Sequence, residues 1–197
     1  MFLVRNLSVL LCLLLLASCS EKKVSSTTES KNIDSVIILP VIKTVNYFSA
    51  KTSESKDFST SDMKDIPTVV YFMFTTCKGP CPIINKQTET LISELNIPVR
   101  FVAITVDPET DTESKLLEYS KSFSYKKNSW FFIRTNPDSL RSIAVNNFMV
   151  GDIESPMVHS TRYILVDKNA KIRGYYDGLD SKAVDKLKID LKSIDTK

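Results

Sequence analysis

TVVYFMFTTCKGPCP, residues 68–82, is the stretch that decides the fold of this chain. Its first half is an uninterrupted apolar run of β-branched and aromatic residues, the pattern of a central strand covered on both faces. Two cysteines follow, and Pro82 begins a segment with apolar residues three and four positions apart, which predicts a helix over 82–96. We therefore expect Cys77 and Cys81 at the carboxyl end of a central strand, the edge where open α/β sheets bind ligands.

Strand-like and helix-like segments alternate around this stretch. The sequence predicts leading strands over 36–39 and 44–48, core strands over 99–106 and 130–133, helices over 109–123, 137–148 and 181–194, and a hairpin of strands 162–166 and 171–176. Strands separated by helices run parallel, whereas a hairpin adds antiparallel strands at one side. The order predicts an α/β protein with a thioredoxin-like fold, in which helices flank a central mixed sheet with an inserted strand-helix unit.

The composition describes one ordinary globular domain with short appendages. Of 197 residues, 43% are hydrophobic and 25% are charged, which excludes a disordered or collagen-like chain. Lys and Arg number 26 against 23 acidic residues, and this net charge of +3 is too small and too evenly spread to favour nucleic-acid binding. The 4 cysteines are too few for a disulfide-stapled scaffold.

The N-terminus has the pattern of an export signal. A short basic start, an apolar run and small residues precede Cys19, and the run is shorter than the about 20 residues of a membrane-spanning helix. Leu16-Ala17-Ser18-Cys19 resembles the bacterial lipobox, in which the cysteine is acylated. We therefore predict a signal peptide over 1–18, a lipidated Cys19 with a flexible polar tether over 19–35, and a folded domain over 36–197. The alternative is a plain secretory signal in which Cys19 is incidental; either cut removes Cys12.

The single histidine, His159, precedes the strand predicted over 162–166. If that strand is antiparallel to the strand before Cys77, His159 faces the two thiols. Two thiolates and one imidazole form a soft site suited to copper or zinc, and three ligands leave a position for a fourth. Met157 is a candidate auxiliary ligand or, alternatively, a packing residue of the loop. The alternatives without a metal are a plain disulfide between Cys77 and Cys81 and a histidine with no ligand role.

The start of the predicted helix affects the chemistry of a thiol placed there. Unpaired main-chain N–H groups at the start of a helix favour a nearby thiolate and lower its pKa. We therefore expect Cys81 to be an activated thiol. Its spacing from Cys77 is one residue longer than that of the redox motif C-x-x-C, which leaves room for a shared metal ion as well as for a disulfide.

Three motifs resemble the Sco/SenC family of copper-handling assembly factors for cytochrome c oxidase. They are FTTCKGPCP at 74–82, ITVDPETDT at 104–112, and the segment from His159-Ser160 to ILVD at 164–167. The resemblance covers most of 44–190 and implies a thioredoxin-like fold with Cys77, Cys81 and His159 as copper ligands. It also implies an acceptor, the binuclear copper site of oxidase subunit II. The chain would then act from a lipid anchor on a bacterial membrane, facing the periplasm or the cell exterior.

Two acidic residues of the second motif, Asp107 and Asp111, have a structural interpretation and a functional one. An acid or Thr110 at this place caps the helix that follows, which we favour over a catalytic or docking role. The sequence also departs from the family at two places. The segment 46–66 lacks the usual glycine-marked hairpin, which predicts shortened leading strands, and Lys78-Gly79-Pro80 replaces an acidic or apolar filling.

The sequence leaves four functions open. The first is a membrane-anchored metallochaperone that delivers copper to the oxidase. The second is a thiol-disulfide oxidoreductase acting through Cys77 and Cys81, which reduces the cysteines of that site or of other exported proteins and does not need His159. A thiol peroxidase and a binding module with a structural disulfide are the remaining alternatives.

Overall fold

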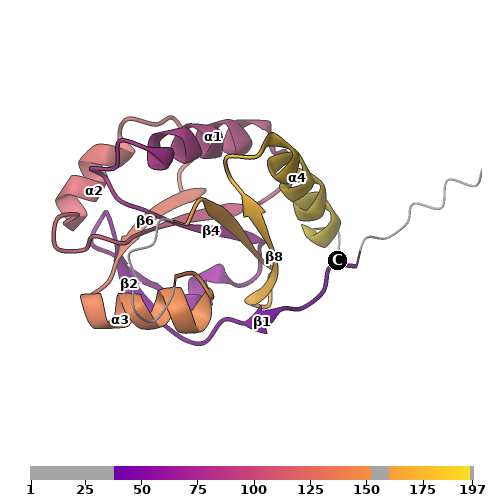
Figure 1. Cartoon of the computed structure of the whole chain (residues 1–197), viewed down its shortest axis with the longest axis horizontal. Coiled ribbons are helices and arrows are strands. Elements are labelled where there is room, and N and C mark those ends of the chain that lie inside the picture. Colours follow the sequence, from indigo (N-terminus) through magenta and orange to yellow (C-terminus); the bar gives the residue numbers. More distant parts are fainter. Residues whose placement is uncertain (1–37, 152–159, 196–197) are drawn as a thin grey trace, which may run out of the picture. The chain divides into compact units, whose positions relative to one another are not determined.

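The computed structural model describes residues 38–151 and 160–195, which are built on one eight-stranded mixed sheet (Figure 1). The strand order is β1-β8-β7-β4-β5-β6-β2-β3. The strands are β1 (Lys43–Thr44), β2 (Ser49–Thr52), β3 (Asp57–Ser59), β4 (Thr68–Met73), β5 (Arg100–Thr105), β6 (Trp130–Arg134), β7 (Arg162–Val166) and β8 (Lys171–Asp177). β5 runs parallel to both β4 and β6, and β7 runs antiparallel to β4.

β4 lies in the interior of the sheet, and all six of its residues are buried. Alternate side chains enter two different cores, because successive residues of a strand point to opposite faces. Val69 and Tyr71 belong to one core, and Val70 and Phe72 belong to the other. This double burial explains why the strand reads as a continuous apolar run.

Helices cover both faces of the sheet. They are α1 (Pro80–Glu94), α2 (Glu113–Ser120), α3 (Pro137–Arg141), the π-helical segment η2 (Ser142–Asn147) and α4 (Ser181–Asp195), and a short 3-10 helix, η1 (Thr60–Met63), follows β3. Figure 1 shows α1, α2 and α4 on one side of the sheet and α3 on the other. The mixed sheet, the antiparallel hairpin and the order of elements confirm the predicted fold class. Among the described helices, none combines the length and apolarity needed to cross a bilayer.

The leading strands differ from the prediction. β1 keeps only Thr44 of the predicted strand 44–48, and it pairs with β8. Ile38 and Leu39 are in no strand, and residues 36 and 37 lie outside the described part. The leading strands are short, as the sequence predicts, and β2 and β3 pair as a hairpin in which Ser55, with φ 60°, takes the left-handed position of the turn. The hairpin therefore forms without a glycine at its turn.

Two helices differ from the prediction, one in its length and the other in its hydrogen bonding. The helix predicted over 109–123 begins at Glu113, because the Thr112 side chain caps it. The helix predicted over 137–148 changes after Arg141 to π-type bonding, in which the Phe148 N–H donates to Ile143 O at 3.0 Å. In this wider turn, Asn147 Oδ1 accepts a hydrogen bond from the Asn46 N–H at 3.1 Å.

Candidate metal centre

The structure brings Cys77 and Cys81 together at the carboxyl end of β4. Cys77 lies in the loop between β4 and α1, where its N–H donates to Phe74 O at 3.3 Å. Gly79 is the N-cap of α1 and provides no side-chain cap, and Pro80 follows it in the first turn. Cys81, also in this turn, is buried, whereas Cys77 is half-buried; both are free thiols. The pair therefore lies at the sheet edge that the sequence predicts.

The two thiols differ in acidity. Burial opposes ionisation of Cys77, but hydrogen bonds from the Cys81 thiol and from the main chain of Cys81 and Gly79 outweigh burial and lower the pKa of Cys77. Burial and the hydrogen bond to Cys77 raise the pKa of Cys81 to about 12. These directions run against the expectation that Cys81 is activated, because Cys81 packs into the core and its thiol donates a hydrogen bond to Cys77.

We expect iodoacetamide to modify Cys77 well before Cys81 in the reduced, metal-free protein at neutral pH. The thiolate is the nucleophile, and Cys77 has both the lower pKa and the greater exposure. Peptide mass spectrometry over a time course measures both rates. Equal rates in the folded protein would contradict this order, and equal rates in urea are the control.

The same shift predicts a loss of stability at alkaline pH. The pKa of Cys81 is about 12 in the folded protein against an ordinary value of 9.0, so folding favours the protonated thiol. This contribution is complete below pH about 9 and is lost as the pH rises from about 9 towards 12. Urea unfolding of the reduced protein across that window should show a decline that Cys81→Ala reduces. An unchanged decline in that variant would contradict the assignment.

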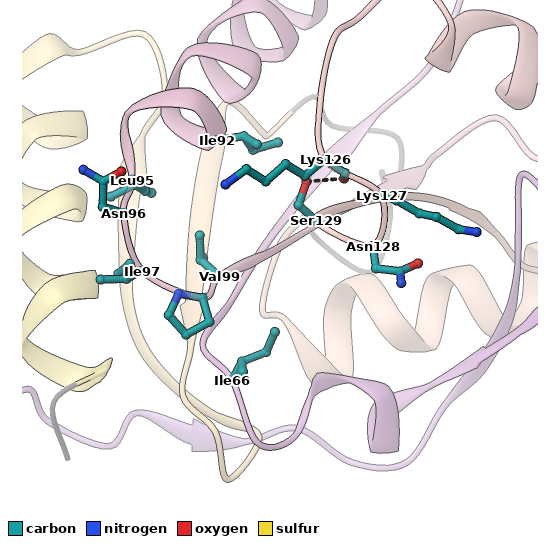
Figure 2. Close-up of a pocket in the computed structure, with 11 residues that line it drawn as sticks. Ile66, Ile92, Leu95, Asn96, Ile97, Val99, Lys126, Lys127, Asn128 and Ser129 are labelled. Carbon is teal, nitrogen blue, oxygen red and sulfur yellow. Dashed lines mark hydrogen bonds between the residues drawn. The ribbon is translucent and has the colours of Figure 1, made fainter.

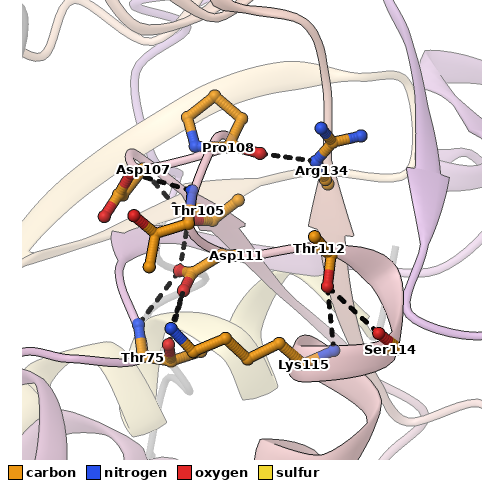
Figure 3. Close-up of polar contacts among 10 residues, drawn as sticks. Thr75, Thr105, Asp107, Pro108, Asp111, Thr112, Ser114, Lys115 and Arg134 are labelled. Atoms are coloured by element: carbon orange, nitrogen blue, oxygen red, sulfur yellow. Dashed lines mark hydrogen bonds and ion pairs between the residues drawn. The ribbon is translucent and has the colours of Figure 1, made fainter.

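Asp111 fixes the cysteine loop to β5 (Figure 3). Its buried carboxylate accepts hydrogen bonds from the Thr75 N–H at 3.0 Å, from Thr75 Oγ1, and from Thr105 Oγ1 at 2.6 Å. Lys115 Nζ lies 3.9 Å from it. Thr75 is two residues before Cys77, so Asp111 holds the loop that carries this thiol.

The helix-capping interpretation of the acidic motif is therefore wrong for Asp111. Thr112 caps α2 instead, since its Oγ1 accepts from the Lys115 N–H at 3.3 Å. Asp107 has the local role that we favoured for both acids, and its Oδ1 accepts from the Thr110 N–H at 3.3 Å in the turn before α2.

A buried hydrogen-bond network that the sequence analysis missed connects α1, α2, β4 and β6. Asn85 Oδ1 accepts from Tyr71 OH at 2.7 Å, and Asn85 Nδ2 donates to Tyr119 OH at 2.8 Å. Trp130 Nε1 donates to Tyr71 OH at 3.0 Å. Burial, and to a smaller degree the charges of the two cysteines, raise the pKa of Tyr119, which places this end of the network near the thiols. The sequence held one signal of this network: Asn85 is a polar residue beside Ile84 on the core face of α1. A buried amide requires hydrogen-bond partners, so its position predicts polar groups nearby.

His159 and Met157 lie outside the described residues, as do Cys12 and Cys19. The structure does test the topology on which the histidine prediction depends. β7 pairs antiparallel with β4, with Ile164 opposite Val70, as predicted. Ser160 follows His159 in sequence and lines a small cavity of about 10 Å³ together with Cys81. Within 38–151 and 160–195, no group of three or more His, Cys, Asp or Glu side chains is arranged to hold a metal.

Gly178, directly after β8, lets its own main chain lie close to the start of β7 and to α1. Its N–H donates to Thr161 O at 2.8 Å, and a Cβ there would lie 2.8 Å from that oxygen and 3.3 Å from Ile84. We expect Gly178→Ala to lower the free energy of unfolding by about 1–3 kcal/mol, because the neighbouring main chain must move. Urea unfolding measures the effect. Leu179→Ala, at an exposed neighbour, is the control, and equal changes in the two variants would contradict the argument.

Comparison with known proteins decides the family. The SCO1/SenC family model matches residues 41–192. This chain belongs to the SCO1/SenC family. The SCO1 protein homolog of Bacillus subtilis is 25% identical over 165 residues, which cover 80% of this chain and 86% of that protein.

Solved structures of the family have the same fold. BsSco, described as having a disulfide switch and as a member of the Sco family of cytochrome c oxidase assembly proteins, has a TM-score of 0.71 and 25% identity, covering 81% of this chain and 98% of its own. Bradyrhizobium japonicum ScoI with copper bound has a TM-score of 0.60 and 18% identity, covering 77% of this chain and 99% of its own. The thioredoxin-like fold expected from the resemblance is thereby confirmed.

Proposed function

We propose that this protein is a metallochaperone that binds copper through Cys77, Cys81 and His159 and delivers it to the binuclear copper site of cytochrome c oxidase subunit II. The observation that carries the proposal is the pair of free thiols held together where β4 ends and α1 begins. Paired thiolates with an imidazole suit copper, and a site with three protein ligands leaves a position through which an acceptor takes the metal over. The copper-bound relative from Bradyrhizobium japonicum supports the choice of metal.

The position of Ser160 supports His159 as the third ligand. Ser160 lines the same small cavity as Cys81, and the antiparallel pairing of β7 with β4 brings the start of β7 to the end of the cysteine-bearing strand. This placement of Ser160 supports the proposal that His159, one residue earlier in the sequence, is the third ligand.

A copper titration of the reduced soluble domain, residues 20–197, tests the proposal. We expect one copper per chain with thiolate charge-transfer absorption, and we expect His159→Ala to lose most of the affinity. A cysteine-containing soluble domain of oxidase subunit II should then take up the metal. Weak binding, or a His159→Ala form that binds like the parent, would contradict the chaperone proposal.

A thiol-disulfide oxidoreductase is the second candidate, and the unequal thiols favour it. A thiol of lowered pKa at Cys77 beside a buried partner at Cys81 is the arrangement of an attacking and a resolving cysteine, which would close a disulfide in each turnover. This activity requires no imidazole. If the His159→Ala variant reduces an exported disulfide substrate as fast as the parent, and the parent binds copper weakly, the oxidoreductase is favoured over the chaperone.

The membrane anchor is a separate part of the proposal. We infer that residues 1–18 direct export, that Cys19 is acylated, and that residues 19–35 join the lipid to the domain over 36–197. Support comes from the lipobox-like Leu16-Ala17-Ser18-Cys19 and from the polar sequence that follows it. Mass spectrometry of the membrane fraction should find an acylated N-terminal Cys19, and Cys19→Ser should release the protein from that fraction. A parent protein recovered entirely without lipid would contradict this part alone.

A further inference from the structure

A cavity of about 460 Å³ lies away from the cysteines, between the end of α1 and the loop before β6 (Figure 2). Its lining is mixed: the apolar part is made by the nearly buried Ile92, Leu95 and Val99 with the half-buried Ile66 and Ile97, and polar residues make the rest. This volume is within the range of small-molecule sites, about 300–1,000 Å³. The size of the hollow therefore fits a small ligand.

One ammonium group faces this cavity. Figure 2 shows the Lys126 side chain running across the cavity toward Ile92, whereas Lys127 points away from it. Lys127 faces the region of Glu54, whose pKa is lowered mainly by Lys56 and to a smaller degree by Lys127. The Lys126 ammonium makes no hydrogen bond or ion pair with the described residues, and no Asp or Glu is among the described residues that line the cavity. The charge at this site is thus positive and uncompensated.

The loop that presents Lys126 is fixed before any ligand arrives. Ser129 Oγ donates to Lys126 O at 2.7 Å, and the Ser129 N–H donates to the same oxygen at 3.1 Å. Ser129 O in turn accepts from the Phe101 N–H at 2.8 Å, which joins the loop to β5. A preorganised site binds with a smaller loss of conformational entropy than a mobile one.

We propose that this cavity binds a small amphipathic monocarboxylate, with the carboxylate on Lys126 Nζ and the apolar body on Ile92, Leu95 and Val99. One cation beside the apolar part of the lining matches a ligand with one negative charge at the end of a short aliphatic or aromatic body. A neutral apolar molecule would leave the ammonium unpaired, and a polyanion would find no second cation pointing inward.

The probe for this site is 4-phenylbutyrate, with 4-phenylbutanamide as its uncharged analogue. We expect the full chain in lipid nanodiscs, with empty nanodiscs subtracted, to bind the carboxylate with a dissociation constant of about 1 mM by ligand-observed NMR. The amide, and the carboxylate on Lys126→Met, should bind at least about fivefold more weakly, since one partly exposed ion pair is lost. Lys127→Met is the matched control and should change the constant by less than about twofold.

The binding measurements can contradict the proposal in several ways. Absence of saturable binding, equal binding of the amide, or equal losses in the two lysine variants would overturn it. So would a Lys126→Met form that is less stable yet binds the probe normally, because Lys126 would then contribute to stability alone. All these measurements use the metal-free protein, so failure of the copper proposal would leave this result unaffected.

Discussion

Replacing Cys81 with serine is expected to lower the Cu(I) affinity of the reduced protein by at least about 100-fold. Changes to groups that only orient metal ligands lower affinity about 10–100-fold, and removal of a soft thiolate ligand should exceed that range. A hydroxyl is a poor ligand for Cu(I), and Cys77 with one imidazole leaves a weaker site. Competition with a chromogenic Cu(I) chelator measures the affinity.

The same variant must be shown to fold. Cys81 is 5% exposed and packs in the core with Ile84 and Tyr163, so its replacement also affects packing. Far-ultraviolet circular dichroism and urea unfolding of the metal-free form provide this control. If the folded Cys81→Ser protein holds Cu(I) within about tenfold of the parent, Cys81 is not a ligand.

Asp111→Ala is expected to reduce the free energy of unfolding by about 2–4 kcal/mol, because the buried donors of Thr75 and Thr105 lose their acceptor. For a domain of this size, that loss lowers the midpoint of thermal unfolding by about 5–15 °C. The variant should also weaken copper binding, since the freed Thr75 leads directly into the cysteine loop. Calorimetry of the metal-free protein and the chelator assay measure the two effects.

Asp107→Ala is the matched control for this prediction. Asp107 belongs to the same acidic motif, but it is partly exposed and accepts a single local hydrogen bond at 3.3 Å. We expect the control to change stability by less than about 1 kcal/mol. Asp111→Asn, which keeps one acceptor oxygen, should fall between the two. Equal effects of Asp111→Ala and Asp107→Ala would contradict the role assigned to the buried carboxylate.

The sequence predicted the central strands well because burial on both faces leaves a local signature. β4 and β6 appear as apolar runs, and β7 was predicted with its observed bounds, Arg162–Val166. The position of the two cysteines followed from the same reasoning, since a strand followed by a helix fixes which sheet edge the connecting loop occupies.

The missed features depend on contacts between residues far apart in the chain. The hairpin of β2 and β3 has no glycine at its turn, and β2 is held in the sheet by pairing with β6, about 80 positions away. The hydrogen bonds of Asp111 to Thr75 join two motifs that the sequence analysis considered separately. The relative acidity of the two thiols depends on burial and on which thiol donates to the other, which spacing alone does not reveal.

The two outermost strands of the sheet are its shortest, with 2 residues in β1 and 3 in β3. A long unpaired edge is the usual starting point for one β protein to add to another, because its main-chain groups accept a further strand. Copies of this protein that meet side by side find only a few such groups at either end. When the short outer strands join the sheet during folding, they thus also cover the edges of the longer apolar strands, which can then no longer pair with another copy to start a fibril.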